Sequence, residues 1–236
     1  MFATAAVILV WKSIQYRNSA ITLQDKYTKA AAEYSKWYVY QTENKNLIDG
    51  QSHPERVVFL GASITQAWDL KQSFPDIEAI NRGIDGNRVG GYLLRFKPDV
   101  VDLAPQAVVI KICSINFRPY SQIGLDEIKD YIISMIDIAE FHNIKPIPAT
   151  VVPVRRAGEQ YGDYKVTEHL QEYNKWLKTY CQNRNLQVID YYSDLADSEG
   201  YLPDDLSIDY IHPNEKGYEI MTQTADKVLV NIMGNR

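Results

Sequence analysis

Short apolar runs that alternate with helical patterns constrain the fold of this 236-residue chain more than any other feature. Five such runs follow one another after residue 55, at 57–60, 77–81, 107–113, 147–152 and 186–191. The run 57–60 is continuously apolar, as in a strand buried on both faces of a sheet, and strands that alternate with helices are typical of a parallel sheet covered on both faces. With right-handed crossovers, the order predicts an α/β fold: a doubly wound, three-layer α/β/α sandwich with a five-stranded parallel sheet.

Helical periodicity fills the intervals between the runs. Residues 126–142 place Ile128, Ile132 and Ile136 on one face, and similar patterns occupy 166–182 and the chain from 214 onward. Residues 20–47 also carry apolar side chains at helical spacing, which predicts a helix packed on the domain.

The N-terminal residues 2–11 form an apolar run that is shorter than the ~20 residues of a spanning helix. No basic segment precedes the run, as it would in a signal peptide. We expect the remnant of an anchor or export segment, with a short helix lying on the domain as the alternative. The chain then divides into an apolar segment (1–19), a helix and linker (20–54) and a main α/β domain (55–236). Residues 1–11 would give peripheral or anchored membrane association and an extracytoplasmic location.

Composition excludes several classes of protein. Twenty-five basic and thirty acidic residues give a net charge of −5 and a pI near 5.4, without any basic run, so we expect no nucleic-acid partner. The two cysteines and four histidines show no metal-ligand spacing. The glycines after residue 82 do not match a dinucleotide fingerprint, so we expect neither a metal nor a cofactor.

Ser63 lies where the run 57–60 ends at Gly61 and a helix could begin. A serine in this position is exposed in the crevice where open α/β sheets bind ligands. A helix N-cap is the structural alternative. Near the other end of the chain, Asp209 and His212 lie three residues apart, just before a strong helical pattern. Serine, histidine and aspartate are the parts of a nucleophile, base and orienter set, which is defined by geometry rather than by chain order.

With these residues the chain resembles the SGNH/GDSL hydrolases over roughly 55–232. Four blocks resemble the family's signatures in the family's order: residues 61–65 (nucleophile), 81–86 (glycine), 114–117 (asparagine) and 209–212 (Asp-x-x-His). Three positions depart from the usual pattern: Ala62 replaces Asp, Ser114 replaces Gly and Phe117 replaces Asp. The resemblance implies a flavodoxin-like strand order and a serine ester hydrolase.

The resemblance also implies the role of each site residue. Ser63 would be the nucleophile, His212 the base and Asp209 its orienter. The oxyanion would lie between the N–H groups of Ser63 and Gly83 and the side-chain amide of Asn116. For Asn116 the alternative is an Asx turn that caps the loop after the third strand.

Three further residues are expected to contact substrate. Phe117 would form one wall of the site. Arg155 and Tyr161 belong to the loop 153–162, which leaves the fourth strand and is long enough to border the site. Arg155 could recognise an anionic group, or the loop could simply be solvated.

The function predicted from the sequence is therefore a carboxylic ester hydrolase for short acyl groups, above all acetyl. Its substrate would be a small-molecule ester or an acylated carbohydrate. Two alternatives remain: an O-acyltransferase acting on a sugar, and a catalytically dead SGNH-like protein that binds carbohydrate.

Overall fold

The computed structural model describes residues 2–50, 55–121, 123–159 and 165–233, and within these ranges it describes the side chains of residues 11–232. In this part of the chain the centre is a parallel sheet of four strands in the order β2-β1-β3-β4. The strands are β1 (Arg56–Gly61), β2 (Glu78–Gly83), β3 (Ala107–Lys111) and β4 (Lys145–Ala149). The predicted α/β class and parallel sheet are confirmed.

The predicted fifth strand, 186–191, is wrong as a strand, because only Ile189 forms a single parallel bridge to β4. Ile189 donates its N–H to the carbonyl of Pro148 (3.0 Å) and accepts a hydrogen bond from the Thr150 N–H (2.9 Å). Alternate residues of β4 direct their backbone groups to this edge, and two of them, Pro146 and Pro148, have no N–H to donate. The ladder therefore cannot extend, although the segment lies where a fifth strand would.

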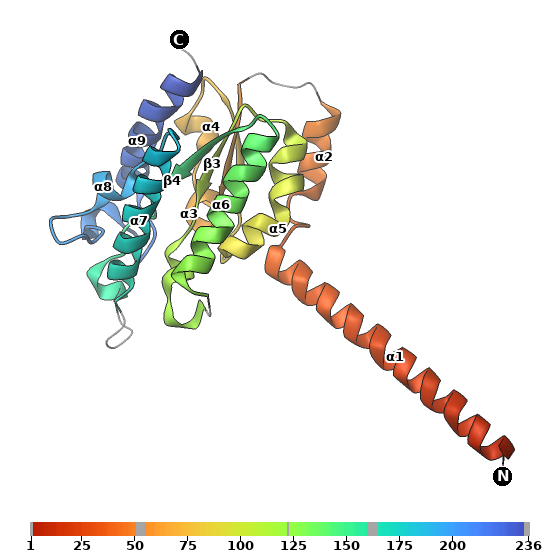
Figure 1. Ribbon diagram of the computed structural model, residues 1–236. Helices are drawn as coiled ribbons and strands as arrows, with labels where there is room; N and C mark the ends of the chain where they lie inside the picture. The colour runs from red at the N-terminus through yellow and green to blue at the C-terminus, as the bar shows by residue number, and fades with distance from the viewer. Residues whose placement is uncertain (1, 51–54, 122, 160–164, 234–236) are drawn as a thin grey trace.

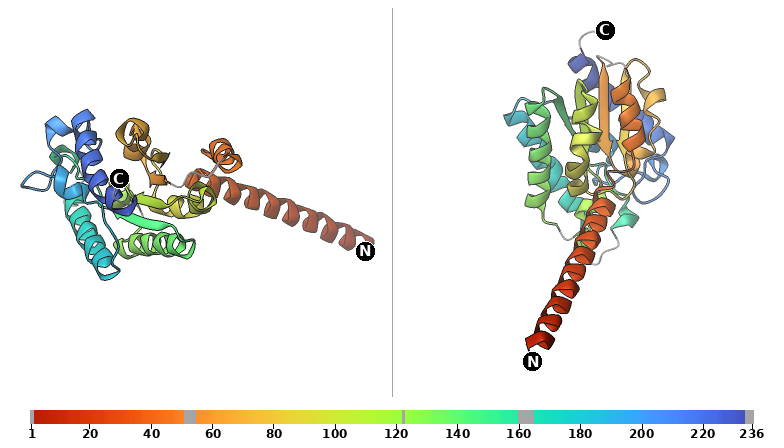
Figure 2. Two further views of the ribbon diagram at one scale, coloured as in Figure 1. Left: turned by 90° about the horizontal axis from the view of Figure 1, so that it is seen from above. Right: turned by 90° about the vertical axis from the view of Figure 1, so that its right-hand side faces the viewer.

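Helices cover both faces of the sheet (Figures 1 and 2). One face packs against α5 (Val89–Asp99), α6 (Leu125–Phe141) and α7 (Val166–Asn183). The other packs against α3 (Ser63–Gln66), α4 (Leu70–Ser73), α8 (Tyr191–Leu195) and α9 (Glu215–Met233). Short 3₁₀ turns connect these elements at Val101–Leu103, Ser114–Phe117, Pro119–Ser121, Arg156–Gly158 and Asp204–Leu206.

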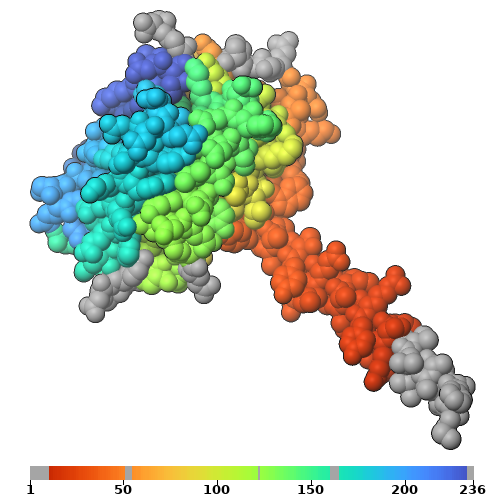
Figure 3. All heavy atoms as spheres, in the orientation of Figure 1, coloured from red at the N-terminus to blue at the C-terminus, as the bar shows by residue number. Residues whose placement is uncertain are grey.

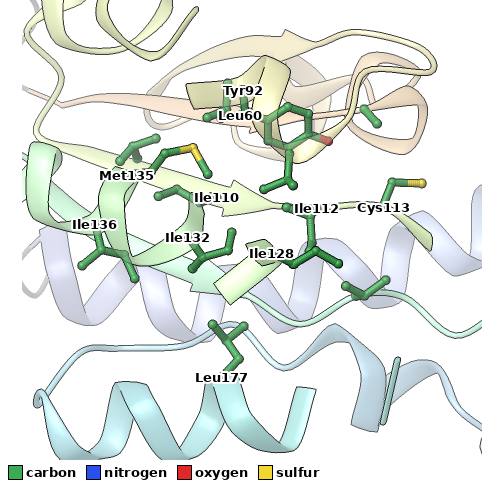
Figure 4. Packing of buried hydrophobic residues seen from close by; sticks show 14 of the residues in the cluster. Leu60, Tyr92, Ile110, Ile112, Cys113, Ile128, Ile132, Met135, Ile136 and Leu177 are labelled. Atoms are coloured by element: carbon green, nitrogen blue, oxygen red, sulfur yellow. The ribbon is translucent and has the colours of Figure 1, made fainter. Parts of the chain in front are cut away.

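The larger hydrophobic core lies under α5, α6 and α7 (Figure 4). Leu60 and Ile110 point into it from neighbouring strands, and Ile128, Ile132 and Ile136 meet them from α6. These five side chains are at most 1% exposed, and each contributes about 1.5–3 kcal/mol by burial. The face of α6 predicted from periodicity is the buried one.

The N-terminal region differs from the prediction of one packed helix over 20–47. The helix α1 (Phe2–Ser35) extends away from the domain (Figures 1 and 3), and the side chains of residues 11–31 are exposed. The helix ends at Ser35; Lys36 follows with a left-handed φ of 53°, and α2 (Gln41–Asp49) begins after it as a separate helix. Residues 2–11 thus begin α1 and do not form a short helix on the domain. In the described ranges we find no helix of the length and apolarity that crossing a membrane requires. Membrane association through residues 1–11 stays a prediction.

A buried polar network joins α2 to the sheet. Asn44 donates to Asp99 Oδ1 (2.7 Å) and accepts from Arg82 Nε (2.9 Å). Asp99 also accepts from Arg95 Nη1 (2.7 Å), and both side chains of that ion pair are nearly inaccessible to solvent. Arg95 Nη2 then donates to the carbonyl of Gly61 (3.1 Å). The network thereby fixes the end of β1, where the candidate site begins.

Candidate active site

Ser63 follows β1 directly and is the first residue of α3. The chain turns sharply here and brings the backbone of Gly61 close to the side chain of Thr65. A Cβ on Gly61 would lie 2.0 Å from Thr65 Oγ1, so the turn needs glycine at this position. Ser63 is half-buried, and its N–H has no acceptor among the described residues. The strand-to-helix position predicted for this serine is present.

Ser63 and His212 meet, although 149 positions separate them in the chain. The distance from Ser63 Oγ to His212 Nε2 is 2.8 Å, and that from His212 Nδ1 to Asp209 Oδ2 is 2.7 Å. An ionised carboxylate only accepts hydrogen bonds, so Nδ1 carries the hydrogen on this side of the ring. Nε2 is then free to accept the hydroxyl hydrogen of Ser63. The arrangement is that of a nucleophile, a base and an orienting acid.

The Asp209 carboxylate is held by its own loop. Its Oδ1 accepts the N–H groups of Ile211 and His212, both at 2.8 Å, which leaves Oδ2 for the imidazole. Burial raises the pKa of this carboxyl, but the hydrogen bonds from Ile211, from the imidazole and from the His212 N–H outweigh it, and the pKa lies below its usual value. Asp209 therefore stays ionised under mildly acidic conditions.

Backbone bonds close the loop that carries Asp209 and His212. Ile208 donates its N–H to the carbonyl of His212 (3.0 Å), and Arg155 donates its N–H to the carbonyl of Tyr210 (2.9 Å). Tyr218 on α9 links this region to the turn that carries Ser63, because its hydroxyl donates to the carbonyl of Ile64 (2.9 Å). Burial raises the pKa of Tyr218 to about 12, so the hydroxyl keeps its hydrogen for this bond. The sequence offered no signal for Tyr218 beyond its place on the inner face of a helix.

Gly83 does not have the role predicted for it. Its N–H donates to Asn81 Oδ1 (2.9 Å), and a Cβ at this position would lie 2.1 Å from the backbone nitrogen of Gln66. The prediction of an oxyanion donor at Gly83 is therefore wrong. The glycine is needed because β2 and α3 approach too closely for any side chain.

Gly86, three residues later, has the properties that were expected of Gly83. It is exposed, has φ of +66°, and its N–H has no acceptor among the described residues. The preceding residues hold the loop beside the turn that carries Ser63: Ile84 donates its N–H to the carbonyl of Gly61 (3.1 Å), and Asp85 donates its N–H to Gln66 Oε1 (2.5 Å). The Asp-Gly pair is a turn signal that could have directed attention to Gly86.

Asn116 has the capping role that was considered for it as the alternative. Its Oδ1 accepts the N–H of Val89 at the start of α5 (3.0 Å), and its Nδ2 donates to the carbonyl of Cys113 (2.9 Å). The side chain is fully buried. An amide nitrogen carries two hydrogens, and the second has no acceptor in the described part of the chain. Asn116 thus caps its loop and keeps one donor, and its oxyanion role stays a prediction.

Three residues were predicted to contact substrate: Phe117, Arg155 and Tyr161. Phe117 is 3% exposed and its ring packs 5.3 Å from the ring of Tyr173, so its place as a wall of the site is corrected to the core. Arg155 is paired with Asp204, with Nε 2.6 Å from Oδ1, and so holds a neighbouring loop. Tyr161 lies outside the described residues. Among those residues no three His, Cys, Asp or Glu side chains gather as metal ligands would.

The chain is similar to known proteins in both sequence and fold. The model of the GDSL-like lipase/acylhydrolase family matches residues 59–220. A GDSL-like lipase from Bacteroides thetaiotaomicron VPI-5482 is similar at 27% identity and a TM-score of 0.76, over 84% of this chain and 98% of that one. A proposed acylhydrolase from Bacteroides fragilis NCTC 9343 is similar at 26% identity and a TM-score of 0.77, over 85% and 99%.

A more distant likeness concerns the fold alone. An acetylxylan esterase from Geobacillus stearothermophilus, solved as a catalytic mutant, has 20% identity and a TM-score of 0.62 over 76% of this chain and 95% of its own. A search of curated proteins found no significant match. Since the family model spans well over half of the chain, the protein belongs to the GDSL-like lipase/acylhydrolase family and is a carboxylic ester hydrolase.

Proposed function

We propose that Ser63 is the nucleophile of this hydrolase, with His212 as its base and Asp209 as the orienting acid. The observation that carries the proposal is the hydrogen-bonded series from Ser63 Oγ to His212 Nε2 (2.8 Å) and from His212 Nδ1 to Asp209 Oδ2 (2.7 Å). Ser63 Oγ attacks the ester carbonyl carbon while its proton passes to Nε2. The bond to the alcohol oxygen then breaks, and His212 returns the proton to the leaving alcohol. Water attacks the acyl-enzyme by the same route and releases the acid.

The negative charge on the tetrahedral oxygen needs donors that are already in place. We assign the backbone N–H groups of Ser63 and Gly86 and the second amide hydrogen of Asn116. All three are without an acceptor among the described residues. Gly86 takes the place that the sequence had assigned to Gly83, whose N–H is already used.

The proposed substrate is an ester of a short acyl group, acetyl above all, with a polar alcohol such as a sugar. One cavity of about 500 Å³ lies between α4 and α9, and another of about 500 Å³ lies beside the C-terminal end of α6. Neither cavity is lined by Ser63 or His212. A third cavity, of about 390 Å³, is lined by the proposed oxyanion donor Asn116 and by Phe117, so the cavities do not set the acyl length. The proposal of a short acyl group is supported by the fold shared with an acetylxylan esterase.

Hydrolysis is favoured over transfer to a sugar by solvent access. The side chains of Asp209 and His212 are 47% and 24% exposed, so water can reach the base. Acyl transfer requires that water be kept from the acyl-enzyme, and a carbohydrate-binding protein without activity would need none of the hydrogen-bonded series. Both alternatives become outcomes of the test.

The test is p-nitrophenyl acetate hydrolysis by the wild type, Ser63→Ala and the control Ser134→Ala. Ser134 lies on α6, where its hydroxyl only donates to the carbonyl of Asp130. Ser63→Ala should remove turnover without lowering Tm, and Ser134→Ala should match the wild type. Full activity of Ser63→Ala would refute the nucleophile. A sugar acceptor that diverts most of the acetyl group would favour the transferase. Across acetate, butyrate and octanoate esters, kcat/KM should fall, and a maximum at octanoate would refute the short-acyl proposal.

A further inference from the structure

The end of α1 and the segment that joins it to α2 lie against the loop that carries Gly86. We call residues 34–40 the strap and residues 83–87 the glycine loop. Three hydrogen bonds join them: Tyr40 Oη to the Gly83 carbonyl (2.5 Å), Lys36 Nζ to the Asp85 carbonyl (2.6 Å) and Asn87 Nδ2 to the Tyr34 carbonyl (3.0 Å). The strap therefore holds the beginning, the middle and the end of the glycine loop.

The middle of the glycine loop is a β-turn whose central peptide joins Asp85 to Gly86. Asn87 donates its N–H to the carbonyl of Ile84 (3.0 Å), which closes the turn. Gly86 has φ of +66° and Asp85 does not have a positive φ, as in a type II turn. A type I turn differs from it by reversal of the central peptide, and glycine accepts both forms without steric cost. The turn by itself would leave the direction of the Gly86 N–H open.

Lys36 removes this freedom. The carbonyl of Asp85 and the N–H of Gly86 belong to one planar trans peptide, so they point in opposite directions. The Lys36 ammonium binds that carbonyl, and it is also the atom nearest to the place that a Cβ on Gly86 would occupy (3.9 Å). With the oxygen held on the strap side, the N–H points away from the strap. A cation on the carbonyl also polarises the peptide and strengthens the N–H as a donor.

The backbone of Lys36 gives a second, independent observation. Its φ of 53° is left-handed, at the residue after a helix, where glycine or asparagine is usual. A lysine there bears a steric cost that glycine would avoid. The same conformation aims its side chain at the glycine loop, and no glycine could supply the ammonium.

We propose that Lys36 is a positioning residue that locks the Asp85–Gly86 peptide in the orientation needed to stabilise the oxyanion. The inference rests on the proposed function, in which the Gly86 N–H is an oxyanion donor. The N-terminal strap is then a working part of the active site, although it lies before the residues that the family model matches.

The test is Lys36→Gly, which keeps the left-handed backbone and removes the ammonium. Its matched control is Asn185→Gly, at the same φ of 53° beyond the end of α7. Lys36→Gly should keep or raise Tm, leave KM for p-nitrophenyl acetate unchanged and lower kcat about tenfold, part of the ~10²–10³ lost with a whole donor. Lys36→Asn, which also tolerates this backbone, should behave alike, and Asn185→Gly should keep the wild-type kcat.

Two results would overturn the inference while leaving the proposed function intact. In one, Lys36→Gly and Lys36→Asn keep the wild-type kcat in an enzyme that still depends on Ser63. In the other, only KM rises, and only for an anionic ester such as p-nitrophenyl hemisuccinate, because the ammonium then binds substrate. Failure of the proposed function looks different: the Ser63→Ala variant would keep the turnover of the wild type, whichever residue stands at position 36.

Discussion

Lys111→Met is a substitution for which the structure predicts both a gain in stability and its pH dependence. Lys111 ends β3, its side chain is 2% exposed, and its Nζ has no hydrogen-bond partner in the described ranges. Burial lowers the pKa of this ammonium from 10.5 to about 8. Methionine fills a similar volume without a charge, so the free energy of unfolding should rise.

The magnitude follows from the two pKa values. The difference between 10.5 and about 8, at about 1.36 kcal/mol per pH unit, gives ~3 kcal/mol at pH 7, where the lysine is protonated in both states. As the pH rises above 8, the folded protein loses this proton while the unfolded chain keeps it. The unfolded state then binds more protons, and wild-type stability increases towards pH 10.5 relative to the variant. The advantage of methionine is thus greatest near pH 7 and shrinks as the pH rises.

The assay is urea unfolding of the wild type and Lys111→Met at pH 7 and pH 10, with Lys45→Met at an exposed site of α2 as the control. Taking the difference between variant and wild type removes the tyrosine titrations that both proteins share. We expect a gain of ~3 kcal/mol at pH 7, or roughly 6–12 °C in Tm for a chain of this size. A less stable variant, or a difference independent of pH, would refute the reasoning, since the amine would then have a partner that stabilises its charge.

Three further substitutions test the proposed oxyanion donors Asn116 and Gly86 and the neighbouring Gly83. Asn116→Ala should lower kcat by ~10²–10³ and also lower Tm, because the Val89 N–H loses its acceptor; an unchanged kcat per folded molecule would restrict Asn116 to its turn. Gly83→Ala should strongly lower Tm or prevent folding, because its Cβ would lie 2.1 Å from the nitrogen of Gln66. Gly86→Ala should fold, with a lower kcat, because alanine disfavours φ of +66°; equal losses of Tm in the two glycine variants would contradict this distinction.

The sheet and its helices could be predicted because their signals are local. Apolar runs of strand length and the 3.6-residue period of 126–142 depend on neighbouring residues alone, and the structure has those elements within a few residues. The fifth strand failed because its partner, β4, carries Pro146 and Pro148 at the shared edge. The single helix predicted over 20–47 was wrong for a different reason. The helix is interrupted at Lys36, whose left-handed backbone accompanies a contact to Asp85, 49 residues away in the chain.

In the candidate site, too, the features with local sequence signals could be predicted and those that depend on distant contacts could not. Asp209 and His212 lie on one turn, and Ser63 lies where a parallel strand ends, so topology alone brings their side chains to the same edge of the sheet. Spacing predicted that Asp209 and His212 approach each other, and the family resemblance implied that Ser63 joins them. The direction of a single N–H group could not, because it depends on which glycine of 81–86 is already bonded.

Gly83 and Gly86 show how that dependence works. In the sequence both are glycines of one loop, and the earlier one is nearer the end of its strand. Three-dimensional contacts separate them: the Asn81 side chain takes the N–H of Gly83, and the Gln66 backbone occupies the space where a side chain would lie. Gly86 then remains as the exposed glycine of a type II turn, with its peptide held by Lys36 from a segment outside the family match. If that hold is what orients the donor, the catalytic competence of this chain depends on residues that its signature motifs do not contain.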